Sequence, residues 1–217
     1  FLVKYPDSPF AWQVCRLASE AFRQANNFAK AIEYGERAVV LNPQDPLAMI
    51  IVADALAEGS LKGELDYEGK LARAEQHAKR ALEILPQFFA GLQFPPNFTP
   101  EQIAQQENLI EAQPHATLGY IYILRNQYEQ ATEELGKATE LGALQPNAMD
   151  FIRLGHAYMF LEKYEEAVAA FRRATALGGP LYDAAVQRLQ LAEQKLAERQ
   201  GKVEKPPETK PTQPPQP

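Results

Sequence analysis

The side chains in this sequence that are best suited to chemistry are its three histidines and its single cysteine. A metal site would require His77, His115 or His156 to have Cys, Asp or Glu residues at a recognised ligand spacing, and none of them does. Cys15 has no second cysteine with which to form an intramolecular disulfide or a cysteine-rich zinc site. We therefore expect no metal site, and we expect Cys15 to act as a small buried apolar residue.

Motifs for phosphate binding and for nucleophilic catalysis are missing as well. The Gly-Lys pairs at Gly69 and Gly136 are followed by Leu and Ala, whereas a phosphate-binding loop needs Ser or Thr at that position. Ser8, Ser19 and Ser60 lie outside any nucleophile elbow. The sequence thus predicts no catalytic residue, no cofactor and no enzyme.

The composition restricts the class of partner. The 217 residues include 28 Asp and Glu against 22 Lys and Arg, which gives a net charge of -6. Proteins that bind nucleic acid depend on a basic surface, so DNA and RNA are unfavourable partners. No run of eighteen apolar residues occurs, so no membrane span is predicted. The hydrophobic content of 46% is sufficient for a globular core.

Two stretches of the chain share one pattern. The stretch "LGYIYILRNQYEQATEELGKA" begins at Leu118, and "LGHAYMFLEKYEEAVAAFRRA" begins 36 residues later at Leu154. Both contain two alanines seven residues apart, which places the alanines on nearly the same side of a helix after two turns. Small side chains there allow a neighbouring helix to approach closely. The same spacing occurs in four places: Ala31/Ala38, Ala74/Ala81, Ala131/Ala138 and Ala167/Ala174.

This pattern resembles the tetratricopeptide repeat (TPR), a unit of about 34 residues that forms a helix, a turn and a second helix. The resemblance covers Trp12 to Gly179, and its third and fourth copies match nearly every signature position. It implies an all-α fold, a right-handed α-α superhelix, and we expect the bacterial type. The second copy departs most from the signature, because its two alanines are the only residues of its second helix clearly in register.

The spacing between copies predicts an order of segments along the chain. Residues 1–11 are expected to be a cap or the end of a preceding repeat. The other expected segments are repeat one (12–45), repeat two with an extended loop between its helices (46–87), a Phe- and Pro-rich insert with a helix (88–111), repeat three (112–147), repeat four (148–180), a capping helix (181–200) and a Pro-rich disordered tail (201–217).

The insert contains its own helix start. Thr99 supplies a hydroxyl for the helix cap and Pro100 suits the first turn, so we expect an extra helix near 100–111. The preceding residues 88–98 include four phenylalanines, and a loop this apolar should not face water. It is expected to fold back either over the outer surface or into the concave groove.

The resemblance implies a site as well as a fold. Proteins of this family usually bind a peptide or a helix in the concave groove lined by the first helix of each repeat, which makes a non-catalytic protein–protein adaptor the expected function. The groove is expected to become more apolar toward repeat four, which suits an apolar or amphipathic segment of another protein. The expected peptide-binding residues are Arg16, Glu20, Ile50, Asp54, Tyr120, Ile123, Leu124, Met149, Ile152, Arg153, His156, Met159 and Phe160.

Two alternatives to this peptide-binding adaptor remain open. The insert or the capping helix could cover the groove, and the chain could be a scaffold that forms a homo-oligomer through an uncapped N-terminal end. The family's clamp for a C-terminal carboxylate is absent, because the slots for its Lys, Asn and Arg residues hold Arg16, Glu20, Ile51, Gln113 and Thr117.

The first twelve residues are similar to repeat junctions of bacterial envelope proteins such as the outer-membrane assembly lipoprotein family. This resemblance favours the cell envelope or periplasm, with the cytoplasm as the other compartment.

Overall fold

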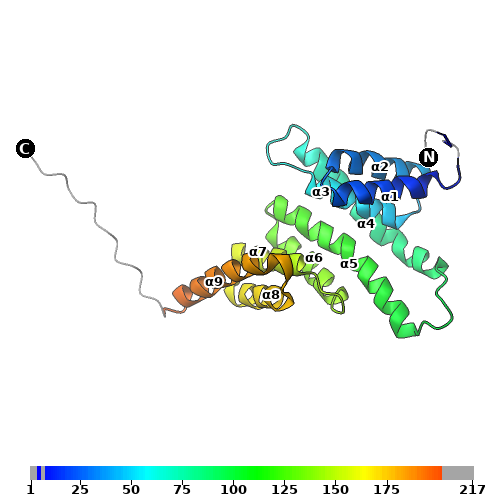
Figure 1. Cartoon of the computed structure of the whole chain (residues 1–217). Coiled ribbons are helices and arrows are strands. Elements are labelled where there is room, and N and C mark those ends of the chain that lie inside the picture. Colours follow the sequence, from blue (N-terminus) through cyan, green and yellow to red (C-terminus); the bar gives the residue numbers. More distant parts are fainter. Residues whose placement is uncertain (1–3, 6–7, 202–217) are drawn as a thin grey trace, which may run out of the picture.

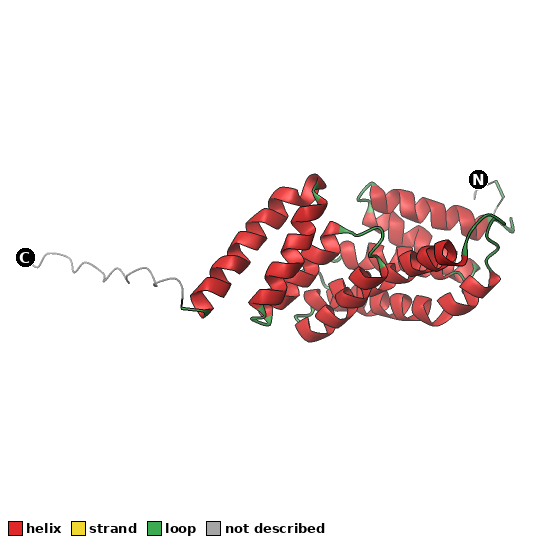
Figure 2. Ribbon diagram, turned by 90° about the horizontal axis from the view of Figure 1, so that it is seen from below, coloured by secondary structure: helices red, strands yellow, loops and turns green. Residues whose placement is uncertain are grey.

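The computed structural model describes residues 4–5 and 8–201, and every regular element within them is a helix (Figure 1). Seen from below, the described part consists of helices joined by loops (Figure 2). The elements are α1 (Ala11–Gln24), α2 (Phe28–Leu41), α3 (Pro46–Glu58), α4 (Tyr67–Gly91), α5 (Pro100–Leu124), α6 (Tyr128–Leu141), α7 (Ala148–Phe160), α8 (Tyr164–Leu177), the 3-10 helix η1 (Gly179–Leu181) and α9 (Tyr182–Arg199).

The helices pack as successive pairs. The pairs α1/α2, α3/α4, α5/α6 and α7/α8 make the main contacts, and each pair also packs against the next. The first helices of neighbouring pairs touch as well, α1 with α3, α3 with α5 and α5 with α7. These four helices therefore form a continuous inner layer, and the expected all-α TPR solenoid is confirmed.

Small residues set the spacing between the paired helices. All eight alanines of the repeated pattern are at most 2% exposed. Gly119 on α5 faces Leu135 on α6, and Gly155 on α7 faces the ring of Phe171 on α8. Large side chains of the second helices thus fill the space left by small residues of the first helices.

Local signals in the sequence fix several helix starts. Asn27, Asp45 and Asn147 each accept a hydrogen bond from a backbone N–H in the first turn of the following helix. Thr99 and Gln102 form the two reciprocal hydrogen bonds of a capping box at the start of α5. The helix start expected at Thr99 is therefore present.

The insert differs from its expected form. The helix expected at 100–111 does not stand alone, because it is the first part of α5, which continues without a break through Pro114 to Leu124. Phe88 and Phe89, expected in a loop, lie in α4, which continues past Pro86 to Gly91. An internal proline costs a helix about 3 kcal/mol, which burial of neighbours such as Leu85 offsets.

The end of the repeat array is covered by α9. This helix packs against α8 and buries Ala185 and Ala192. Arg199 donates a hydrogen bond to the backbone carbonyl of Glu162 in the turn between α7 and α8. The Pro-rich tail expected at 201–217 lies, after Gly201, outside the described residues.

The cysteine and two of the histidines make contacts that serve the fold. Cys15 is fully buried, and burial raises the pKa of its thiol. The Nδ1 atom of His115 lies 2.6 Å from a carboxylate oxygen of Glu134, and Nε2 of His77 lies 3.3 Å from Glu36. Within residues 4–5 and 8–201 no group of three or more His, Cys, Asp or Glu residues is arranged to hold a metal ion. No helix in that part is both long and apolar enough to cross a membrane.

Candidate functional site

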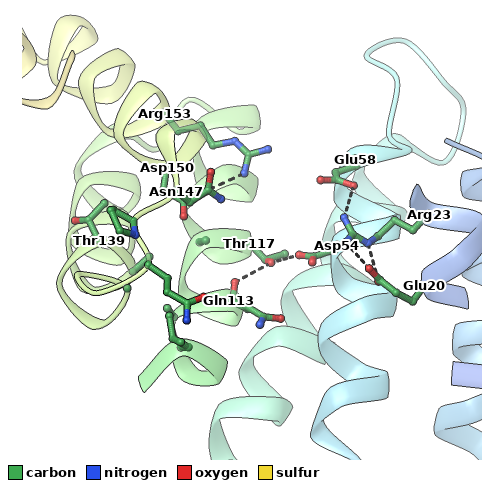
Figure 3. A pocket seen from close by; sticks show the side chains of 17 residues that line it. Glu20, Arg23, Asp54, Glu58, Gln113, Thr117, Thr139, Asn147, Asp150 and Arg153 are labelled. Carbon is green, nitrogen blue, oxygen red and sulfur yellow. Dashed lines mark hydrogen bonds and ion pairs between the residues drawn. The ribbon is translucent and has the colours of Figure 1, made fainter. Parts of the chain in front are cut away.

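A cavity of about 470 Å³ opens on the inner layer of the solenoid (Figure 3). Helices α1, α3, α5 and α7 all contribute to its wall, as do the end of α6 and the loop before α7. Its lining residues are Glu20, Arg23, Asp54, Glu58, Leu109, Ala112, Gln113, Ala116, Thr117, Ala138, Thr139, Gly142, Gln145, Pro146, Asn147, Asp150 and Arg153. We call this space the central cavity.

One wall of the central cavity carries an ion-pair cluster centred on Arg23. Its guanidinium donates hydrogen bonds to both carboxylate oxygens of Glu20, at 3.1 and 3.0 Å, and to Glu58 at 3.2 Å (Figure 3). Burial alone would lower the pKa of Arg23, but these hydrogen bonds and the nearby carboxylates outweigh it and raise the pKa. Arg23 is therefore fully charged and already occupied by protein carboxylates.

The middle of the central cavity contains Asp54, Thr117 and Gln113. The Thr117 hydroxyl lies in hydrogen-bonding contact with the Asp54 carboxylate and 3.0 Å from the Gln113 backbone carbonyl (Figure 3). A hydroxyl has one proton to donate, so it satisfies only one of these two acceptors at a time. Burial raises the pKa of Asp54 to about 6, against the opposing effects of Thr117 and Arg23.

The opposite wall is formed by the start of α7. Asp150 is 9% exposed, and its Oδ1 atom has no hydrogen-bond partner. The nearest guanidinium nitrogen, Nη1 of Arg153, lies 3.9 Å from that oxygen, and the Arg153 guanidinium stacks 4.0 Å from the centre of the Tyr120 ring. Burial raises the pKa of Asp150, although Arg153 and Asn147 oppose this effect.

A second, more apolar cavity of about 270 Å³ lies between α7, α8 and α9. Phe160 is 54% exposed and stacks in parallel on Tyr128, with ring centres 4.3 Å apart, while His156 meets its edge. Burial and the charge of Arg188 lower the pKa of His156, which favours its neutral form. The residues lining this distal cavity are His156, Met159, Phe160, Phe171, Arg188 and Leu191.

The structure separates the expected site residues into groups. The central cavity contains Glu20, Asp54 and Arg153, and the distal cavity contains His156, Met159 and Phe160. The others line neither of these two cavities. Among them, Arg16 lies 3.6 Å from Asp45, and Tyr120 stacks on Arg153. Ile123 and Leu124 pack against core clusters, and Met149 is half-buried in the first turn of α7.

Two expected contact residues are not accessible. Ile50 is 1% exposed and packs with Met49 and Ile84, and Ile152 is 6% exposed and belongs to the cluster around Phe171. Both face a neighbouring helix because the inner helices are packed on more than one side. We therefore exclude both from the candidate site.

Sequence reasoning also missed residues that the fold brings together. Glu58, Asn147 and Asp150 line the central cavity but were not expected there. A signal for Glu58 existed, because it follows Asp54 by one helical turn and so shares its face. Asp150 could be recognised only after the start of α7 was known to lie opposite α3.

The Phe-rich segment lies away from the central cavity. None of residues 88–99 lines that cavity. Phe88 and Leu92 line a separate space with Gln44, and Phe89 lines another with Glu107 and Glu111 of α5. Phe94 and Phe98 stack on each other, with ring centres 5.9 Å apart.

Comparison with known proteins agrees with this architecture. The family model for the tetratricopeptide repeat matches residues 112–141 and 151–177. The crystal structure of TTC0263, a thermophilic TPR protein in Thermus thermophilus, is similar over 89% of this chain and 85% of that one, with 17% identity and a TM-score of 0.60. The MamA protein is similar over 90% of this chain and 87% of its own, with 13% identity and a TM-score of 0.57. No curated protein matches the sequence.

Proposed function

Because the chain is a tetratricopeptide repeat protein, we propose that it is a non-catalytic adaptor that holds a peptide or helix of another protein on its inner face. The observation that carries this proposal is the central cavity, to which all four inner helices, α1, α3, α5 and α7, contribute side chains. A segment seated there contacts every repeat at once. Such a segment gains affinity from a groove that is formed before binding.

The chemistry of the inner face favours an amphipathic segment. Asp150 and Arg153 line the central cavity, and His156 and Phe160 line the distal cavity further along the same helix. Residues three and four positions apart share a helix face, so one face of α7 is polar near its start and apolar near its end. Met159 and Phe160 supply adaptable apolar contacts at the distal end.

Filling the central cavity is expected to abolish partner binding. Ala116 is half-buried in the wall, and Ala116→Trp would place an indole ring in the space that the partner needs. We expect capture of a partner from a native-like lysate to fall at least about tenfold, since one displaced anchor costs roughly 1.4 kcal/mol or more.

The matched control is Ala169→Trp, which adds the same ring at an exposed position on α8 outside the central cavity. Circular dichroism of both variants should show unchanged helicity. Equal capture by the wild type and by a folded Ala116→Trp protein would show that the partner binds elsewhere.

A second candidate function, assembly through self-association, is favoured by apolar residues on the first helix pair. Leu17 on α1 is 65% exposed and Val40 on α2 is 79% exposed, and Phe10 before α1 and Leu41 at the end of α2 are 60% and 45% exposed. Exposed apolar side chains gathered on one helix pair indicate an interaction surface. In this alternative the first repeat stacks on another copy of the chain.

Under the assembly alternative, analytical ultracentrifugation at high protein concentration is expected to show a dimer. Leu17→Glu is then expected to return the protein to a monomer, because it places a charge in the apolar contact. Leu61→Glu, at a position that is 66% exposed in the loop between α3 and α4, is the control. A wild type that sediments as a monomer at every concentration would rule this alternative out.

A further inference from the structure

We propose that the distal cavity binds a large apolar side chain of the partner segment, and that Arg188 in its wall pairs with an acidic residue beside that side chain. This inference rests on the proposed adaptor function, because it assigns the partner's chemistry at one end of the same inner face. It goes beyond an apolar contact, since it fixes the sign of the partner's charge. The walls of the cavity and its charge support it independently.

The distal cavity has apolar walls on all three of its helices. Met159 and Phe160 come from α7, Phe171 from α8 and Leu191 from α9 (Figure 1). Phe160 and Leu191 are 54% and 49% exposed, and large apolar side chains exposed around one hollow indicate an interaction site. The volume of about 270 Å³ is below the roughly 300–1,000 Å³ of cavities that hold whole small molecules, so this cavity suits one side chain of a partner.

The aromatic wall is in place before a partner binds. Phe160 stacks on Tyr128 of α6 with ring centres 4.3 Å apart, and the edge of His156 meets it at 4.9 Å. Phe171 is 1% exposed, and Met159 packs against the core cluster that contains it. The rings therefore lose little conformational freedom when a side chain enters, while the flexible methionine can adapt to its shape.

Arg188 lacks a carboxylate partner. Its guanidinium donates one hydrogen bond, to the Ala184 carbonyl at 3.1 Å, and forms no ion pair within the part of the chain that the structure describes. A guanidinium has five N–H donors, so the protein leaves most of this group's hydrogen-bonding capacity unused. Arginine binds carboxylates through two parallel hydrogen bonds, which makes an acidic side chain a suitable partner.

No other charge on the wall of the distal cavity offsets that of Arg188. Burial and the charge of Arg188 lower the pKa of His156, so its imidazole is neutral at pH 7.5. Arg188 is then the one charged side chain that lines the cavity. An acidic residue beside the bound apolar side chain complements this wall, whereas a basic residue is repelled.

The acidic residues in the second half of α9 have partners of their own. Glu193 forms an ion pair with Arg172 of α8 at 2.7 Å, and Glu198 forms one with Lys195 at 3.0 Å. Neither of them lines the distal cavity. The carboxylate that pairs with Arg188 is therefore expected to come from the partner.

Nuclear magnetic resonance titration of the full chain with three capped dipeptides tests both parts of the proposal. The probe is acetyl-Phe-Glu amide, acetyl-Phe-Gln amide removes its charge, and acetyl-Ala-Glu amide removes its ring. We expect the probe to shift the methyl signals of Met159 and Leu191. Loss of the ring should weaken binding at least about tenfold, and loss of the charge about threefold, because Arg188 is exposed to solvent.

Variants of Arg188 show whether this residue selects the charge. Arg188→Gln is expected to bind acetyl-Phe-Glu amide and acetyl-Phe-Gln amide equally, and Arg188→Glu is expected to prefer acetyl-Phe-Lys amide. A purely structural role of Arg188 would not reverse the preferred charge. Arg37→Gln, which removes the same charge at an exposed position on α2, should keep the wild-type preference.

Several outcomes would overturn the proposal. Equal binding of the three dipeptides, shifts confined to other surfaces, or an unchanged preference in Arg188→Glu would show that this cavity and its charge select no such partner. Probe binding that appears only after removal of residues 202–217 would assign the cavity to the chain's own tail. A dimer in analytical ultracentrifugation that Arg188→Glu dissociates would assign it to a second copy.

The outcomes also separate this inference from the adaptor function. If Ala116→Trp prevents partner capture but acetyl-Phe-Glu amide does not bind the distal cavity, the groove function stands and the acidic, apolar specificity is wrong. If the dipeptide binds as expected but Ala116→Trp has no effect on capture, the distal cavity is a site of its own and the assignment of the central cavity is wrong.

Discussion

Gly119→Ala and Gly155→Ala are each expected to lower the free energy of unfolding by about 1–2 kcal/mol, although alanine normally favours a helix. A Cβ atom at Gly155 would lie 2.7 Å from Cε1 of Phe171, and one at Gly119 would lie 2.5 Å from Cγ of Leu135. Phe171 and Leu135 are fully buried and cannot move aside without disturbing the paired helix. Urea denaturation followed by circular dichroism measures the change.

The matched control has the opposite expected sign. Gly136 lies on α6 with nothing within 4 Å of an added Cβ, so Gly136→Ala should raise the free energy of unfolding by about 0.5–1 kcal/mol. Combining Gly155→Ala with Phe171→Leu should cost less than the sum of the two single changes, because the smaller side chain makes room for the methyl group. A stabilised Gly155→Ala protein would show that this close approach between α7 and α8 is not tight.

Asp54→Asn is expected to stabilise the folded protein at pH 7.5 by about 1 kcal/mol or more, with an upper bound of about 3 kcal/mol set by 1.36 kcal/mol per pKa unit. The pKa of Asp54 rises from 3.8 to about 6 on folding, so between these values the folded chain binds more protons than the unfolded chain. The stability lost to this carboxylate therefore grows as pH rises from about 4 to 6 and is constant above about 7. Screening by solvent at this half-buried residue keeps the effect below the upper bound.

The pH dependence distinguishes this effect from a simple gain in packing. At pH 4 the wild-type carboxyl is neutral in the fold, so the variant should have little advantage there, whereas the advantage should be full above pH 7. The amide introduced by Asp54→Asn can also donate to Thr117, which then serves the Gln113 carbonyl. Urea denaturation of both proteins at the two pH values measures the difference, and an advantage that is equal at pH 4 and 7.5 would contradict the assignment.

Much of the architecture could be read from the sequence because it depends on local spacing. Alanines seven residues apart placed small side chains on one face of each second helix, and Thr99 marked a helix start through its own side-chain hydrogen bond. The boundaries of the insert were not readable, since α4 continues past Pro86 to Gly91 and the helix expected at 100–111 continues past Pro114 to Leu124. A proline removes one hydrogen bond locally, and the burial that compensates for it is not visible in the sequence.

The candidate site could be predicted only in part, because burial by neighbouring repeats is not visible in the sequence. Repeat positions placed Glu20, Asp54 and Arg153 in the groove, and these residues do line the central cavity. The same positions also selected Ile50 and Ile152, which packing buries. A repeat pattern specifies the side of a helix but not how deeply the next repeat covers it.

The sequence by itself therefore determined the class of fold, the pairing of helices and the close approach at the repeated alanines, because each follows from residue size at fixed helical spacing. Only the tertiary structure decided that Asp54 and Asp150, on α3 and α7, face one cavity while Arg23 is held by Glu20 and Glu58. Charge balance in a cavity depends on which helices meet across it. Which helices face each other depends on how the four repeats pack in succession, and the sequence of one repeat does not specify that packing.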